Sequence, residues 1–146
     1  MARYEDLAPN FRQALMERAK TKQPYWGLLG IELVDIKKGW AKLRLPFSEK
    51  LIHPYRIVNG GAIFSLADAA VAMALLGLIE RDERFTTIEM NISYLRPFEN
   101  GEITAAASIA HKGRNTALGD VDITDQQGRL TAKSRATYMI YDYRKQ

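Results

Sequence analysis

One segment of the sequence, residues 60–79, is almost entirely apolar. It reads GGAIFSLADAAVAMALLGLI, and among its aliphatic, aromatic and small residues only Ser65 and Asp68 are polar. A helix that is hydrophobic on every side must be buried, so this segment predicts a long helix at the centre of the protein. A membrane span is the alternative, since about 20 apolar residues can cross a bilayer. We do not expect one, because the segment is rich in alanine and glycine and a carboxylate is costly in lipid.

The segments around this helix predict a second helix and six strands. The spacing of apolar residues predicts an amphipathic surface helix at 9–20, and alternation around a turn predicts a hairpin at 31–47. Residues 24–30 are expected to be a break, and 48–58 a loop. Further strands are expected at 85–95, 102–111, 116–124 and 129–141, with turn spacing typical of an antiparallel meander. This order of elements predicts an α+β fold in which the central helix packs against a curved antiparallel sheet.

Composition narrows the possible functions. The 146 residues predict a single domain, 1–146. The chain has no cysteine, and its two histidines, His53 and His111, are far apart, so we expect no metal and no cofactor. A net charge of +4 favours an anionic small-molecule partner, whereas scattered basic residues and the lack of aromatic RNA-binding motifs argue against nucleic acid. The first 20 residues lack the apolar core of a signal peptide, so we expect a cytoplasmic location.

Asp68 is the first candidate for a catalytic residue. Its sequence neighbours are leucine, alanine and valine, which disfavour a charged carboxylate unless hydrogen bonds or a functional role compensate. Ser65 to Asp68 resembles a capping box, which is the structural alternative. If the helix begins near Gly60, however, Asp68 lies more than one turn inside, too deep for capping to be its main role. We therefore expect a catalytic carboxylate.

The start of the same helix is the second candidate. Asparagine is among the best N-cap residues, so Asn59 followed by Gly60 and Gly61 could simply turn the chain into the helix. Glycines at a helix N-terminus also leave backbone N–H groups accessible, and such donors can stabilise an oxyanion. Combined with a carboxylate that activates water or attacks directly, this arrangement predicts an acyl-transfer hydrolase that needs no serine, cysteine or metal.

Three stretches of the sequence resemble a known family. Residues 53–68 (HPYRIVNGGAIFSLAD) and 86–97 (TTIEMNISYLRP) resemble the helix signature and the next strand of hotdog-fold thioesterases of the phenylacetyl-CoA (PaaI) type, and 112–116 (KGRNT) resembles a later turn. The resemblance covers most of the chain after about Gly30. It implies the hotdog fold, in which a curved antiparallel sheet wraps around a central helix, and hydrolysis of aryl or medium-chain acyl-CoA thioesters.

The resemblance also implies roles for individual residues. Asp68 would act as general base or nucleophile, and the Gly60 N–H would polarise the thioester carbonyl. Thr87, or Thr86 one position earlier, would help to hold the attacking water. The positions expected to contact the substrate or its coenzyme A are Gly61, Tyr94, Arg96, Lys112, Gly113 and Arg114. Each basic residue among these could equally be a solvated strand end.

The chain departs from the family pattern at two positions. The family usually has histidine where this chain has Asn59, and often asparagine six residues earlier, where this chain has His53. An amide and an imidazole can both donate to a carbonyl or orient a water, so both residues remain candidates for the site. The exchange could instead alter substrate preference or reduce turnover, and a loop histidine before proline can also be an ordinary surface residue.

The resemblance implies at least a homodimer, with a homotetramer expected and the active site across an interface. An open sheet edge favours pairing on general grounds as well. Two other functions stay open: an acyl-thioester hydratase or dehydratase using His53 with Asp68, and a non-catalytic acyl-CoA-binding protein. The sequence does not identify the acyl group. The residues that could line its pocket, or belong to the core instead, are Trp26, Leu28, Leu29 and Phe64.

Overall fold

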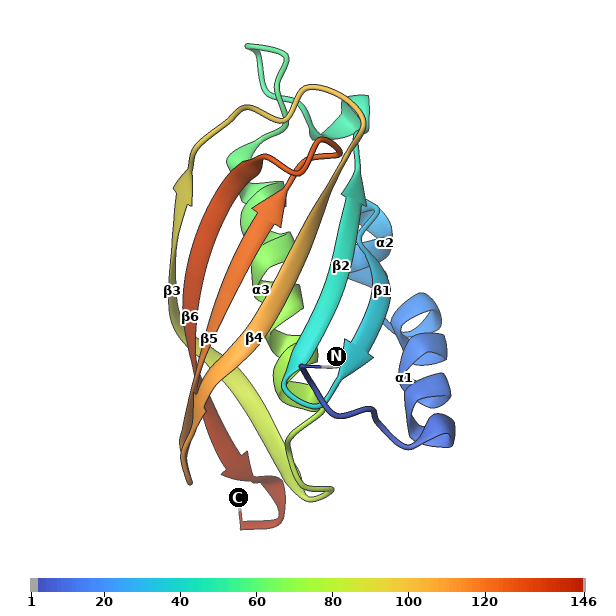
Figure 1. Cartoon of the computed structure of the whole chain (residues 1–146), viewed down its shortest axis with the longest axis vertical. Coiled ribbons are helices and arrows are strands. Elements are labelled where there is room, and N and C mark those ends of the chain that lie inside the picture. Colours follow the sequence, from blue (N-terminus) through green and yellow to red (C-terminus); the bar gives the residue numbers. More distant parts are fainter. Residues whose placement is uncertain (1–2, 146) are drawn as a thin grey trace.

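The computed structural model describes residues 3–145, which form a six-stranded antiparallel sheet and three α-helices (Figure 1). The helices are α1 (Pro9–Thr21), α2 (Pro24–Leu29) and α3 (Gly60–Leu76). The strands are β1 (Glu32–Lys37), β2 (Trp40–Pro46), β3 (Glu83–Tyr94), β4 (Glu102–Lys112), β5 (Thr116–Thr124) and β6 (Leu130–Asp142). Single 3₁₀ turns occupy Glu49–Leu51 and Tyr143–Lys145.

The long apolar helix α3 lies at the centre, as the sequence predicts, and the sheet curves around it (Figure 1). At Gly119 of β5, an added Cβ would lie 2.5 Å from Val71 Cγ1 of the helix. Any larger residue here would therefore force the helix or the Val71 side chain to shift. Of the helices within residues 3–145, none combines the length and hydrophobicity of a membrane span.

The expected meander is correct for only three strands. β4, β5 and β6 follow one another across the sheet, but the full order is β1-β2-β4-β5-β6-β3, so β3 pairs with β6 at the sheet edge. The loops between β4, β5 and β6 are short, so each of these strands pairs with the next one as a hairpin. The longer connection from β3 to β4 crosses the end of the sheet instead (Figure 1).

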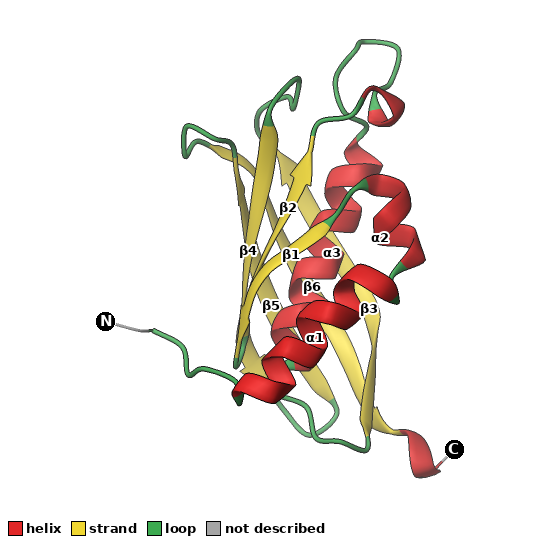
Figure 2. Cartoon of the chain, turned by 90° about the vertical axis from the view of Figure 1, so that its right-hand side faces the viewer, coloured by secondary structure: helices red, strands yellow, loops and turns green. Residues whose placement is uncertain are grey.

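Residues 24–30, expected to be a break, contain the short helix α2. Pro24 begins this helix, where its fixed backbone angle is favourable, and Gly30 ends it with a φ of 92°. Trp26 is buried between these ends, so tertiary packing stabilises a helix of only six residues. Figure 2 shows α1 and α2 beside α3 on the same side of the sheet.

A β-bulge in β3 changes which side chains face the helix. Thr87 pairs with Tyr138 and Glu89 pairs with Thr137, so Ile88 is the extra residue. Phe85 before the bulge and both Met90 and Ile92 after it pack against the core, although strict alternation would put them on opposite faces. The bulge thus allows Thr87 to point inward without turning the later apolar side chains outward.

Candidate active site

The carboxylate of Asp68 meets hydroxyl groups from two strands. Thr87 Oγ1 donates a hydrogen bond to Asp68 Oδ1 at 2.9 Å, and the Tyr138 hydroxyl donates to the same oxygen. The Tyr138 hydroxyl also lies 2.8 Å from the backbone carbonyl of Asp68. Burial raises the pKa of Tyr138 above its ordinary value, and the neighbouring Asp68 charge raises it further, so this hydroxyl stays protonated.

The second carboxylate oxygen of Asp68, Oδ2, is available to a ligand. Oδ2 accepts no hydrogen bond from any residue in the described range 3–145, so both hydroxyl groups orient the carboxylate through Oδ1 alone. Asp68 is half-buried and lines a cavity of about 250 Å³. The other lining residues are Gln23, Tyr25, Trp26, Ser65, Ala69, Ala72, Met73 and Phe85. A small acyl or aryl group can therefore reach the carboxylate.

The residues expected to line an acyl pocket have different positions. Trp26 is buried and lines the cavity beside Asp68, whereas Leu28 is 68% exposed and lies outside it. Leu29 and Phe64 are half-buried and do not line this cavity. Thr86, the alternative to Thr87, is exposed, so the hydroxyl that contacts Asp68 is that of Thr87.

The start of α3 presents one free backbone donor. Asn59 is the N-cap: its Oδ1 accepts from the Gly61 N–H at 2.9 Å, and its carbonyl accepts from the Ala62 N–H at 3.0 Å. The Gly60 N–H has no acceptor among the described residues. The Tyr94 hydroxyl donates to the Gly60 carbonyl at 2.8 Å, and a Cβ at position 60 would lie 3.0 Å from the Tyr94 ring. Glycine thus lets Tyr94 pack against the first turn.

A second cavity, of about 380 Å³, opens at this helix start. It brings together four residues singled out in the sequence: His53, Gly60, Tyr94 and Arg96. The Tyr55 N–H donates to His53 Nδ1 at 3.0 Å, so a neutral His53 carries its proton on Nε2, where it can donate to a ligand.

The turn with Lys112, Gly113 and Arg114 lies far from this cavity in the same chain. Lys112 Nζ lies 3.9 Å from the carboxylate of Glu83, at the beginning of β3. Tyr94 ends the same strand. Because a strand advances about 3.3 Å per residue, Glu83 and Tyr94 lie more than about 30 Å apart. One chain therefore does not bring this turn together with His53 and Arg96.

Known proteins are similar to this chain in sequence and in fold. A family model described as the thioesterase superfamily matches residues 55–132, just over half of the chain. The chain belongs to the thioesterase superfamily. A 1,4-dihydroxy-2-naphthoyl-CoA hydrolase from Listeria monocytogenes is 33% identical over 117 residues, which cover 80% of this chain and 95% of that protein. The acyl-coenzyme A thioesterase PaaI of Escherichia coli is 32% identical over 110 residues, 73% of this chain and 75% of PaaI.

Solved structures agree with this assignment. The E. coli PaaI protein from the phenylacetic acid degradation operon superposes with a TM-score of 0.79 at 25% identity, covering 90% of this chain and 95% of PaaI. The conserved protein PA5202 from Pseudomonas aeruginosa gives a TM-score of 0.77 at 29% identity, covering 80% and 93%. The predictions of a hotdog thioesterase fold and of a thioester hydrolase are therefore confirmed.

The two candidate groups, the Gly60 N–H and the Asp68 carboxylate, lie apart along α3. Positions 60 and 68 are eight residues apart, and a helix rises about 1.5 Å per residue, so Gly60 and Asp68 are separated by about 12 Å. A single thioester carbonyl cannot lie beside both groups of one chain.

Tyr138 is the contact of Asp68 that the sequence analysis did not single out. β6 presents small residues to the interior at Ala132, Ser134 and Ala136, and then a tyrosine at 138. A buried tyrosine hydroxyl usually requires a partner, and this contrast with the small residues was the available signal. The partner itself lies 70 residues away in the sequence, at Asp68.

Proposed function

We propose that the protein hydrolyses acyl-CoA thioesters to a free acid and coenzyme A, with Asp68 as general base or nucleophile. The observation that carries this proposal is the Asp68 carboxylate, held through Oδ1 by Thr87 and Tyr138 while Oδ2 remains free beside a cavity. A positioned carboxylate of this kind can take a proton from water or attack a carbonyl directly.

In the general-base route, Asp68 Oδ2 removes a proton from water, and the hydroxide adds to the thioester carbonyl. The carbonyl oxygen becomes an oxyanion, which the free Gly60 N–H at the positive end of α3 in a second copy of the chain stabilises. The carbonyl then re-forms, the C–S bond breaks, and the proton passes to the departing thiolate. Thr87 keeps the carboxylate in position and can accept a hydrogen bond from the attacking water.

In the nucleophilic route, Asp68 Oδ2 attacks the same carbonyl and releases the thiolate first. Water then hydrolyses the resulting mixed anhydride. Hydrolysis in ¹⁸O-labelled water with enzyme in excess identifies a nucleophilic route in which water attacks the aspartyl carbon of the anhydride. That attack labels Asp68 itself, whereas the general-base route, or water attack on the acyl carbon of the anhydride, labels only the acid product.

The separation of Gly60 and Asp68 supports a site shared by two copies of the chain. β3 is an edge strand with free backbone groups, which favour pairing with a second β3. If two β3 strands pair antiparallel about their centre, near Asn91, the half of one strand that carries Thr87 runs alongside the half of the other that carries Tyr94. Asp68, bonded to Thr87, would then approach Gly60 of the second copy.

The same pairing would complete a site for coenzyme A. The beginning of β3, where Glu83 lies beside Lys112, would lie alongside the end of β3 in the second copy, where the cavity lined by His53 and Arg96 opens. Lys112 and Arg114 would add positive charge where the phosphates of coenzyme A need it. We therefore expect at least a homodimer, and a homotetramer as the complete assembly. Light scattering at assay concentration tests this: a fully active monomer would contradict the shared site.

The decisive experiment measures thiol release from a panel of aryl- and acyl-CoA thioesters, with Asp68→Asn as the comparison. This substitution preserves size but removes the base. We expect kcat to fall by about 10²- to 10⁴-fold while the oligomer stays intact. Unchanged turnover in the variant would remove Asp68 from the mechanism. A natural protein that binds coenzyme A but releases no thiol from any thioester would instead be a binding protein or a hydratase.

A further inference from the structure

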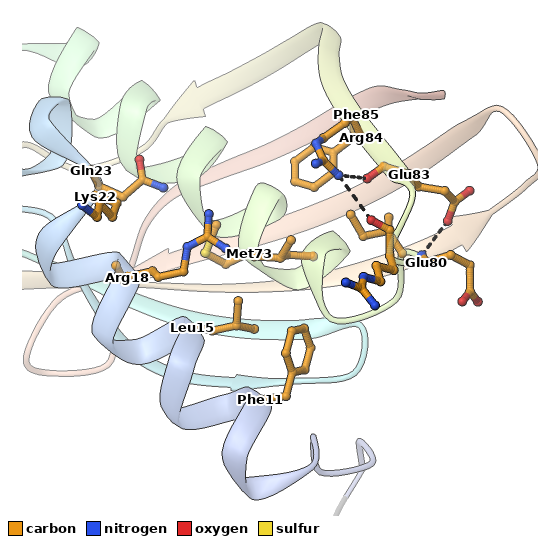
Figure 3. A pocket seen from close by; sticks show the side chains of 14 residues that line it. Phe11, Leu15, Arg18, Lys22, Gln23, Met73, Glu80, Glu83, Arg84 and Phe85 are labelled. Carbon is orange, nitrogen blue, oxygen red and sulfur yellow. Dashed lines mark hydrogen bonds between the residues drawn. The ribbon is translucent and has the colours of Figure 1, made fainter. Parts of the chain in front are cut away.

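A cavity of about 740 Å³ lies beneath α1 (Figure 3). Its apolar wall comes from α1, from the C-terminal half of α3 and from the chain that leads into β3. The residues of this apolar wall are Phe11, Leu15, Ala19, Met73, Leu76, Ile79 and Phe85. The rest of the lining is charged or polar and consists of Arg18, Lys22, Gln23, Glu80, Arg81, Glu83 and Arg84. Phe11 is 46% exposed although it points toward the opposite apolar wall, so its ring is incompletely covered by protein. The volume lies within the range of about 300–1,000 Å³ typical of small-molecule sites.

This cavity adjoins the one beside Asp68. Gln23, Met73 and Phe85 line both, so these three side chains lie between the two spaces. From Asp68 to Leu76 the helix advances eight residues, or about 12 Å at 1.5 Å per residue. A ligand held by its carbonyl at Asp68 that passes between these side chains along α3 would end beneath α1.

We propose that the cavity beneath α1 receives the distal part of a long, unbranched acyl chain, so that the preferred substrates are acyl-CoA thioesters of about twelve carbons or more. This inference rests on the proposed thioesterase function. An extended alkyl chain advances about 1.25 Å per methylene, since C–C bonds of about 1.52 Å meet near the tetrahedral angle. About ten methylenes therefore cover the distance from Asp68 to Leu76.

An aryl substrate would use much less of this space. The cavity of about 250 Å³ beside Asp68 accommodates one aromatic ring, which would leave the larger cavity unused. A flexible chain fits both, and its methylenes would contact the apolar wall formed by Leu15, Met73 and Leu76. Each methylene removed from water contributes about fourfold to binding, so chain length should strongly affect kcat/KM.

The test compares two substitutions on α1 across saturated acyl-CoA thioesters from four to eighteen carbons. Ala19→Trp fills the cavity, because Ala19 lines it. Ala14→Trp is the matched control, because Ala14 is exposed on the same helix and does not line the cavity. Leu76→Phe narrows the cavity from the α3 side and replaces Ala19→Trp if that variant fails to fold.

For the natural protein we expect kcat/KM to rise with chain length up to at least twelve carbons. Ala19→Trp should lower the dodecanoyl value at least tenfold, since loss of two buried methylenes already costs about fifteenfold. Its butanoyl value, and every value of Ala14→Trp, should stay within about twofold. A preference for short or aryl substrates, or an Ala19→Trp effect equal at all lengths, would overturn the inference but leave the thioesterase function intact. If no thioester of any length is hydrolysed, both proposals fail.

Discussion

Combining two variants, each expected to have very low activity, in one dimer tests whether the site is shared between subunits. The first variant is Asp68→Asn. The second is Gly60→Pro, which removes the free N–H at the first residue of α3, a position where proline is favourable. The preceding residue, Asn59, has φ −57° and ψ 134°, an extended conformation that suits a residue before proline. Gly60→Ala is the control, because it adds a Cβ beside Tyr94 and keeps the N–H.

The expected recovery follows from the separation of about 12 Å along α3. If each site takes Asp68 from one copy and Gly60 from the other, a mixed dimer contains one site with both groups intact and one with both altered. Equal mixing gives mixed dimers in half of the population, so about a quarter of the natural activity should return. Each variant alone should lose at least about 10²-fold, the usual effect of removing an oxyanion donor or a catalytic base.

The assay is thiol release after the two variants are co-expressed with different affinity tags and the doubly tagged dimers are isolated. These isolated dimers should have about half of the natural activity, because one of their two sites is intact. Doubly tagged dimers with no more activity than the single variants would refute the shared site. Gly60→Pro as active as Gly60→Ala would refute the role of the Gly60 N–H.

Two further substitutions test the packing around α3. Tyr138→Phe removes one of the two hydrogen bonds that hold Asp68 Oδ1, so kcat should fall by about tenfold, since a hydrogen bond to a charged group contributes about 1.5–3 kcal/mol; an unchanged kcat would contradict this contact. Because the pKa of Tyr138 is raised on folding, the natural protein should lose stability above about pH 10, and the variant should lose less of it in urea titrations. Gly119→Ala should destabilise the fold by about 1–3 kcal/mol, because its Cβ would lie 2.5 Å from Val71 Cγ1. Thermal unfolding should show partial recovery when Val71→Ala is added, and no recovery would place the strain elsewhere.

The central helix and most strands were predictable because their signals are local. An apolar run of helical length can only be buried, and alternating residues define strands regardless of their neighbours. α2 was missed because Pro24 and Gly30 signal a break, and a helix of six residues is not stable by itself. Its stability depends on burial of Trp26, which is a tertiary effect. The pairing of β3 with β6 is equally non-local.

In the candidate site, too, the residues with local sequence signals were predictable and the contacts between distant residues were not. Asp68 was recognisable because a carboxylate is unexpected among alanines and leucines, and the helix start was recognisable from its glycines. The partner of Tyr138 was not recognisable: a large residue among small ones suggests that the hydroxyl needs a partner, but nothing near it in the sequence indicates that this partner is Asp68. The sequence also did not predict that Lys112 and Arg96 lie far apart, because their distance depends on which strand ends meet in the fold.

The bulge at Ile88 gives β3 one place where its length can change. Without Ile88, Glu89 would follow Thr87 directly, so Glu89 would still face solvent and Met90 and Ile92 would still face the core. Loss of a residue after the bulge would instead turn every later side chain to the opposite face, and Tyr94 would leave the Gly60 carbonyl. In the evolution of this chain, a lost residue in β3 should therefore be tolerated at the bulge and excluded beyond it.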